Sequence, residues 1–267
     1  MNEFILLNSA NYITPEHAGR VILCGSHGGL YSAFKAVSRK VRAAVFSDAA
    51  IGKDGAGIAS LAFCDPHALP VAVIDYMSAR IGDAADMLER GRVSRCNRTA
   101  GALGVDPGMT CAQALELLSA AAPVFRPFAP VGEHRSEVTL APGGEAIVCL
   151  DSASLILPED AGRVVVTGSH GGLIGGATTK AINVPARLAV FNDAGGGMDD
   201  AGAGRLKPLD AMGIGAVLVD VMSARIGDAL STLNDGVISR VNRTAAGAGV
   251  TVGRKLSEAL RPITTQQ

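Results

Sequence analysis

The stretch RVILCGSHGG, from Arg20 to Gly29, decides the fold, because an apolar run ends there in a glycine-rich turn. The same pattern returns as RVVVTGSHGG from Arg163 to Gly172. A short apolar run bounded by turn residues is typical of a buried strand, and glycine permits the tight turn that follows. Each stretch therefore predicts a strand that ends at GSHGG and leads into a helix.

The likeness between the two stretches continues on both sides of the motif. Phe4 aligns with Ile147 and Leu115 aligns with Leu260, with a two-residue insertion in the second copy, and the motif SARIGDA occurs in both. Such self-similarity is the signature of an internal duplication. We expect two tandem homologous repeats that share a joint core in one pseudo-twofold unit. The predicted boundaries are repeat 1 at 1–118, a linker at 119–145 and repeat 2 at 146–267.

Apolar runs alternate with helical patterns inside each copy. Val41–Phe46 and Pro70–Asp75 contain continuous apolar runs, which suit strands buried on both faces of a mostly parallel sheet. Leu30–Arg39 has helical spacing, and Val93–Leu103 is interpreted as a helix that ends before a capping glycine. A further strand is predicted in the linker at Glu137–Leu140. The pattern predicts an α/β fold built from βαβα-type repeats.

The composition excludes several classes of function. The 267 residues are 48% hydrophobic and carry a net charge of −1, which gives no electrostatic reason to expect nucleic acid. No apolar run approaches the length that spans a bilayer, and Met1–Leu7 does not read as a secretory signal. The five cysteines are widely spaced without a C-x-x-C pair, which favours buried reduced thiols. We therefore expect a cytoplasmic protein without nucleic-acid or membrane partners.

The GSHGG turn is the first candidate site. A turn between a strand and a helix brings free backbone N–H groups together and favours an anion or a developing oxyanion. His27 and His170 are candidates for general acid or base, and Ser26 and Ser169 for a hydroxyl donor or nucleophile. The alternative is a tight turn whose histidine only caps a carbonyl. The glycines expected to contact the substrate are Gly28, Gly29, Gly171 and Gly172.

A second candidate follows the next predicted strand. Asp48 and Asp193 come directly after buried runs, at the sheet edge where parallel strands bind ligands. Asp48 is expected to orient His27 or to activate a water molecule. Capping of a glycine-rich turn is the competing interpretation for both carboxylates. Lys53 is a candidate substrate contact in the first copy only, because its counterpart is Met198.

SARIGDA, at residues 78–84 and 223–229, is the third candidate. Arg80 and Arg225 are expected to hold a substrate carboxylate bidentately. Asp83 and Asp228 stand at predicted helix N-caps. An arginine–aspartate pair between the two copies would explain the same residues without a ligand, since identical contacts recur under twofold symmetry.

These patterns lead to one function and its alternatives. We expect an enzyme, a hydrolase or lyase, that acts on a small anionic carboxylate or a cyclic amide by hydrolysis or a related acid–base step. A non-catalytic binding protein for a small anionic metabolite and a pure assembly interface are the alternatives. No cofactor is expected; a divalent metal at His27, Asp48 and Asp83 is the weaker alternative, because no familiar ligand spacing is present. A homo-oligomer is a further expectation that the sequence leaves open.

Overall fold

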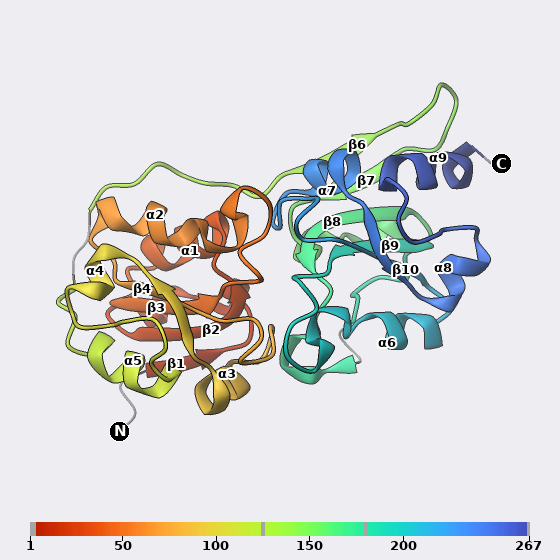
Figure 1. The fold of residues 1–267 in the computed structure, drawn as a ribbon. Coiled ribbons are helices and arrows are strands. Elements are labelled where there is room, and N and C mark those ends of the chain that lie inside the picture. Colours follow the sequence, from red (N-terminus) through yellow and green to blue (C-terminus); the bar gives the residue numbers. More distant parts are fainter. Residues whose placement is uncertain (1–3, 124–125, 179–180, 266–267) are drawn as a thin grey trace.

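The computed structural model describes residues 4–123, 126–178 and 181–265. Two mixed sheets lie side by side, and helices are interleaved with their mostly parallel strands (Figure 1). The predicted α/β fold class is therefore confirmed. We call the first sheet with its helices the N-terminal half and the second sheet with its helices the C-terminal half.

The N-terminal half contains a sheet of five strands in the order β1-β2-β3-β4-β5. The first four are parallel, and β5 is antiparallel to β4. The strands are β1 (Phe4–Leu7), β2 (Val21–His27), β3 (Ala43–Ser47), β4 (Val71–Ile74) and β5 (Val93–Cys96). The α-helices are α1 (Leu30–Ser38), α2 (Ala59–Cys64), α3 (Ala84–Arg90), α4 (Arg98–Gly101) and α5 (Cys111–Leu118).

The C-terminal half contains a sheet of six strands in the order β11-β10-β9-β8-β7-β6. The strands β7 to β10 are parallel, whereas β11 and β6 are antiparallel edge strands. The strands are β6 (Arg135–Val138), β7 (Ile147–Leu150), β8 (Val164–His170), β9 (Leu188–Asn192), β10 (Gly215–Val219) and β11 (Ile238–Val241). The α-helices are α6 (Leu206–Ala211), α7 (Ala229–Asp235), α8 (Arg243–Gly247) and α9 (Leu256–Thr265). None of the helices in the described ranges is long and apolar enough to cross a bilayer.

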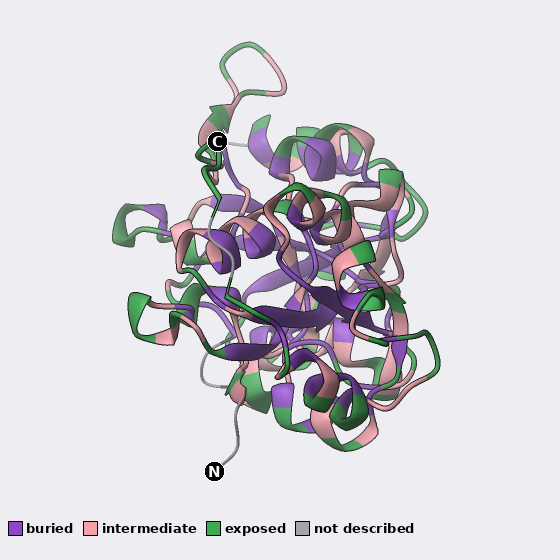
Figure 2. Ribbon diagram, turned by 90° about the vertical axis from the view of Figure 1, so that its left-hand side faces the viewer, coloured by how far each residue is buried: buried purple, intermediate pink, exposed green. Residues whose placement is uncertain are grey.

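Both sheets are buried on their two faces (Figure 2). In β2, Leu23 packs with α3 and α5 residues on one face, and Ile22 packs with α1 residues on the other. Successive side chains of a strand point to opposite faces, so a strand covered on both sides must be apolar throughout. This explains the continuous apolar runs of the central strands.

The two halves contact each other through backbone as well as side chains. The amide of Lys53 donates to the carbonyl of Val221 at 2.9 Å, and that of Met198 donates to the carbonyl of Tyr76 at 2.8 Å. A small apolar cluster lies at the same junction and contains Ala49, Ile81, Ala194 and Ile226. The contacts involve corresponding loops of the two halves.

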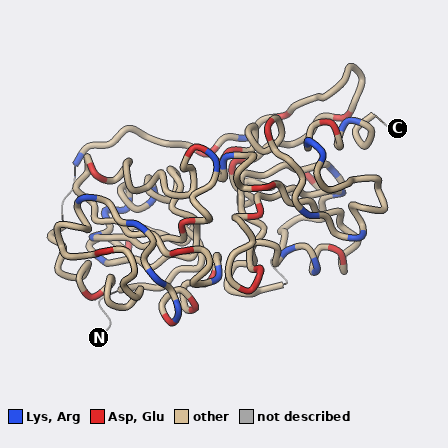
Figure 3. Tube along the Cα trace, viewed as in Figure 1, with Lys and Arg blue, Asp and Glu red and all other residues tan. Residues whose placement is uncertain are grey.

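Ion pairs surround this junction, where acidic and basic residues lie side by side (Figure 3). Arg80 pairs with Asp199 at 2.7 Å, and Arg225 pairs with Asp54 at 3.2 Å. Each pair joins the SARIGDA segment of one half to the loop after the third parallel strand of the other. Both pairs are partly exposed, so each is worth at most about 1 kcal/mol.

Two segments differ from the sequence predictions. The helix predicted at Val93–Leu103 is wrong in its first part, because Val93–Cys96 forms β5 against the free edge of β4 and only Arg98–Gly101 is helical. Pairing with an available sheet edge outweighs local helical spacing. The extra strand is Arg135–Val138, two residues before the predicted Glu137–Leu140, and it pairs with β7. The predicted linker is thus partly an edge strand of the C-terminal half.

A third difference follows the second GSHGG motif. α1 follows the first motif directly, as predicted, but the second is followed by a short 3-10 turn at Ile174–Gly176. Gly175 adopts φ of 60°, a left-handed conformation that interrupts an α-helix. The two halves therefore differ beside their histidines.

Candidate functional site

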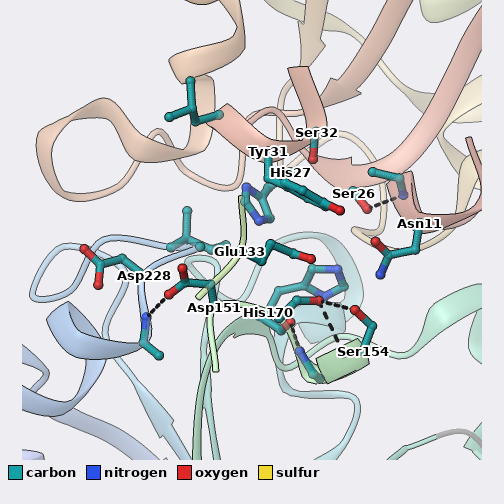
Figure 4. Close-up of a pocket in the computed structure, with 18 of the residues that line it drawn as sticks. Asn11, Ser26, His27, Tyr31, Ser32, Glu133, Asp151, Ser154, His170 and Asp228 are labelled. Carbon is teal, nitrogen blue, oxygen red and sulfur yellow. Dashed lines mark hydrogen bonds between the residues drawn. The ribbon is translucent and has the colours of Figure 1, made fainter. Parts of the chain in front are cut away.

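A cavity of about 780 Å³ lies between the two halves, and we call it the central cavity (Figure 4). Residues of both halves line it, together with Val131–His134 from the connection between them. His27 and His170 stand there at the carboxyl ends of β2 and β8. The edge where parallel strands end is the usual place for ligands in α/β folds.

Each histidine packs against a glycine of the opposite half. A methyl group added at Gly227 would lie 3.3 Å from Cε1 of His27. A methyl group added at Gly82 would lie 3.5 Å from Cε1 of His170. Both glycines belong to SARIGDA, so the two repeated motifs meet across the junction.

Both imidazoles are neutral in this environment. Burial lowers the pKa of His27 to about 4. Burial, with the charges of Arg205 and His27 next in importance, lowers the pKa of His170 to about 3. Nδ1 of His170 accepts a hydrogen bond from the Gly172 amide at 3.2 Å, which places the ring proton on Nε2. Nδ1 of His27 is buried and has no hydrogen-bond partner in the described part of the chain.

The glycines of GSHGG serve packing in this structure. The amides of Gly28 and Gly171 donate to the carbonyls of Ser47 and Asn192, both at 2.8 Å. A Cβ atom at Gly28 would lie 2.8 Å from Oγ of Ser60, and one at Gly171 would lie 2.5 Å from the carbonyl oxygen of Gly202. Gly28, Gly29, Gly171 and Gly172 are not among the residues that line the central cavity.

Ser26 and Ser169 both line the central cavity. Their Oγ atoms accept hydrogen bonds from the amides of Ala10 and Ala153, each at 2.9 Å. The serines act as acceptors in these bonds, and the hydroxyl of Ser26 also hydrogen-bonds to the thiol of Cys24. Neither serine is hydrogen-bonded to a histidine of its own motif in the described structure.

The carboxylates of Asp48 and Asp193 accept hydrogen bonds from backbone amides of neighbouring loops. Oδ1 of Asp48 accepts from the amides of Ala50 at 3.1 Å and Tyr76 at 3.0 Å. Oδ1 of Asp193 makes the equivalent bonds to Gly195 and Val221. They tie the loop after one strand to the loop after the next, and neither residue lines the central cavity.

The basic residues predicted to hold substrate are paired with acids. Arg80 and Lys53 lie outside the cavity lining, and Lys53 pairs with Asp235 across the junction at 2.8 Å. Arg225 lines the cavity, but its guanidinium contacts both Asp54 and Asp228. Asp228 also caps α7, and Asp83 caps α3, as the sequence predicted.

Glu133 is a cavity residue that the sequence did not single out. The connection before β6 places its side chain between Tyr31 of the N-terminal half and the C-terminal half (Figure 4). Burial raises the pKa of Glu133 to about 7, and the nearby charge of Asp151 acts in the same direction. Hydrogen bonding by Ser152 and Tyr31 opposes that rise. Glu133 lies in the linker, so no repeated motif could point to it.

The segment that carries Glu133 is fixed to the C-terminal half. Oδ2 of Asp151 accepts from the backbone amide of His134 at 2.8 Å and lies 2.9 Å from its Nδ1. Oδ1 of Asp151 accepts from the amide of Ala229 at 3.1 Å. These bonds hold the chain beside Glu133 against the start of α7.

Arg205 is the second cavity residue that was missed. It stands where the first copy has Ser60, so comparison of matching positions would have revealed a charged residue in place of a small one. Its side chain is 6% exposed and lies 4.9 Å from the ring centre of Phe191.

Metal ions and reactive thiols are two other sources of chemistry in proteins. The residues that the structure describes contain no group of three or more His, Cys, Asp or Glu side chains placed to hold a metal ion. All five cysteines are free thiols, and four of them are buried. Burial raises the pKa of Cys24 to about 11 and that of Cys149 to about 12, so these thiols stay protonated.

No protein-family model, curated protein or solved structure matches this chain. Its function is therefore inferred from the central cavity and the residues that line it.

Proposed function

We propose that the protein is an enzyme that acts on a small cyclic amide or carboxylate by an acid–base step in the central cavity. One observation carries this proposal: the cavity combines a carboxyl group with a pKa near 7 and two neutral imidazoles. Perturbed pKa values that cluster in one cleft are typical of catalytic sites.

Glu133 is proposed as the residue that moves the proton. A group whose pKa lies near the working pH is both present in its reactive form and strong enough to transfer a proton. With a pKa of about 7, Glu133 can both take up and release a proton near neutral pH. The sequence assigned this step to the histidines, but rings with pKa values of about 4 and 3 are weak bases.

The histidines are proposed to act as neutral hydrogen-bonding groups. His170 has its proton on Nε2, since Nδ1 accepts from Gly172, and it can donate to a substrate carbonyl oxygen. A neutral imidazole that polarises a carbonyl is a known catalytic arrangement. Nδ1 of His27 has no partner among the described residues, and the hydroxyl proton of Ser169 adds a further donor.

We also propose that the two halves are homologous repeats related by a pseudo-twofold axis that passes near the cavity. The paired contacts of His27 with Gly227 and of His170 with Gly82 support this. Glu133 has no counterpart, because it belongs to the single connection. One cavity with one proton-transferring carboxyl predicts one active site in each chain.

The test is a panel of five- and six-membered cyclic amides and imides, each with and without a ring carboxylate, followed by proton NMR. We expect turnover of a member of this panel and a loss of about 100-fold or more in kcat for Glu133→Gln. Glu137→Gln is the matched control, because Glu137 lies on β6 outside the cavity and pairs with Arg163 at the surface. Unchanged turnover in Glu133→Gln would show that another group moves the proton.

A binding protein for a small metabolite is the second candidate. It is favoured by the neutral histidines and by the absence of a serine–histidine hydrogen bond within either described motif. Mass spectrometry of a ligand that remains bound through purification separates the two functions. Recovery of an intact ligand that stays unchanged on incubation with the protein would favour binding over catalysis.

A further inference from the structure

Arg205 is a buried cation that has no counter-ion among the described residues. Its side chain is only 6% exposed, and it lines the central cavity. Across residues 4–123, 126–178 and 181–265, no carboxylate forms an ion pair with it. Removing a charge from water without an opposite charge is expensive, so natural proteins rarely leave one in this state without a function.

Neutral groups hold the guanidinium in place. Nε donates to the carbonyl oxygen of Gly172 at 3.1 Å, and Nη1 donates to the carbonyl oxygen of Ala181. The guanidinium also stacks over the ring of Phe191, 4.9 Å from its centre. Burial lowers the pKa of Arg205 to about 10, which leaves the group charged at neutral pH. These contacts fix the direction of the guanidinium, and none of them, within the described part of the chain, supplies a negative charge.

Arg225 provides the contrast within the same cavity. Its Nη2 lies 2.9 Å from Oδ2 of Asp228, and its Nη1 lies 3.2 Å from Oδ2 of Asp54. Arg205 and Arg225 are the two arginines of the described cavity lining, which includes no lysine. A ligand anion would have to displace two carboxylates from Arg225, whereas Arg205 needs no exchange of partners.

We propose that Arg205 binds the carboxylate of a small organic acid in the central cavity. This rests on the proposed function and selects the carboxylate-bearing members of its substrate class. A guanidinium forms charge-assisted hydrogen bonds with a carboxylate, and the bonds are strongest where water is excluded. The Nη2 group has no protein partner among the described residues and is the donor for this contact.

The position of Arg205 also fixes how the ligand lies. The matching residue of the N-terminal half is Ser60, which is fully buried beside Gly28 and does not line the cavity. The anion site therefore exists only on the C-terminal side, next to His170, whose pKa the charge of Arg205 lowers. A carboxylate held there leaves the rest of the ligand to face Glu133 and His27.

Acetate is the probe that tests this site, because it carries the carboxylate and little else. Thermal unfolding is followed in sodium acetate, in acetamide and in sodium chloride of equal ionic strength. We expect acetate to raise the Tm of the unmodified protein above its value in chloride, with saturation in the millimolar range, and acetamide to have no such effect. Arg205→Met should raise the half-saturating acetate concentration at least tenfold.

The matched control is Arg243→Met, because Arg243 lies on the surface, where it pairs with Asp210. This variant should keep the full response to acetate. Arg205→Lys guards against misfolding of the methionine variant; it keeps the charge but has no planar guanidinium to place a donor at the position of Nη2, so we expect weaker binding of acetate than in the unmodified protein. Acetate binding by Arg205→Met as tight as that of the unmodified protein would overturn the proposal.

Three further outcomes are decisive. No stabilisation of the unmodified protein by acetate beyond chloride would overturn the site. Stronger stabilisation by phosphate than by acetate, lost in Arg205→Met, would replace the carboxylate with a phosphate as the ligand group. Glu133→Gln should still bind acetate, so a failure of the acid–base proposal and a failure of the anion site give different results.

Discussion

Cε1 of His27 lies against Gly227, and a methyl group added at that glycine would lie 3.3 Å from it. The two residues come from opposite halves, and His170 with Gly82 repeats the arrangement. The first SARIGDA segment contributes a backbone bond as well, since the amide of Gly175 donates to the carbonyl of Gly82 at 2.8 Å. The histidine sites and the junction between the halves are thus built from the same residues.

Gly82→Ala should destabilise the protein by about 2–4 kcal/mol, because the position has φ of +84° and the new methyl would lie 2.3 Å from the Leu173 carbonyl oxygen. Gly19→Ala is the matched control: its φ is +73°, but nothing lies within 4 Å of the added methyl. We expect a loss of about 1 kcal/mol for the control. Urea unfolding measures the free energy of unfolding of both variants. Equal losses would mean that the contact between Gly82 and Leu173 adapts to the added methyl group without cost.

Acid should destabilise the protein through the two histidines. The unfolded chain takes up protons near pH 6.5, whereas the folded protein does so only near pH 4 at His27 and pH 3 at His170. Their contribution is complete above pH 6.5 and is lost as the pH falls, by about 1.4 kcal/mol per pH unit for each ring. His27→Asn should therefore flatten the slope of unfolding free energy between pH 6 and 4.5 by about one proton. Equal slopes in the variant and the unmodified protein would mean that His27 is not held neutral.

Glu133 should titrate near pH 7, which carbon-13 NMR of its carboxyl group can follow directly. Tyr31→Phe should raise this pKa further, because the hydroxyl of Tyr31 hydrogen-bonds to the carboxyl and lowers it. The raised pKa stabilises the folded protein at low pH, and this contribution is lost as the pH rises through 7. Glu133→Gln should therefore be more stable than the unmodified protein above pH 7. A normal carboxyl titration near pH 4.5 would contradict its burial.

The ion pairs at the junction should contribute little. Asp199 contacts Arg80 at 2.7 Å and Arg90 at 3.0 Å, and all three side chains are 34–46% exposed. Asp199→Asn should lower the free energy of unfolding by about 1 kcal/mol or less. The difference should shrink further in about 0.5 M sodium chloride, because salt screens exposed charges. A larger loss that persists in salt would show that these pairs dominate the junction.

Much of the fold could be predicted because its signals are local. The strands that end at His27 and His170 follow from apolar runs that stop at glycine, and α1 follows from its helical spacing. Val93–Cys96 could not be predicted in this way, because its strand conformation depends on the free edge of β4. Local spacing does not reveal which sheet edges remain available.

The candidate site was predicted in part, for the same physical reason. The repeated motif placed both histidines at strand ends, and both line the central cavity; their chemical roles remain predictions. Glu133 and Arg205 were not predicted, because neither has a matching residue in the other copy. A comparison that looks for repeated polar residues does not detect such positions. Their positions depend on how the connection and the C-terminal half fold around the cavity.

The backbone bonds between Lys53 and Val221, Met198 and Tyr76, and Gly175 and Gly82 have a consequence for ligand capture. A hinge motion that separated the two halves would break all three of these hydrogen bonds. If the protein binds a ligand as proposed, the central cavity is expected to be formed before binding, so little binding free energy would go into closing the two halves. The selectivity of the cavity for a ligand would then depend on how well the ligand matches its existing shape.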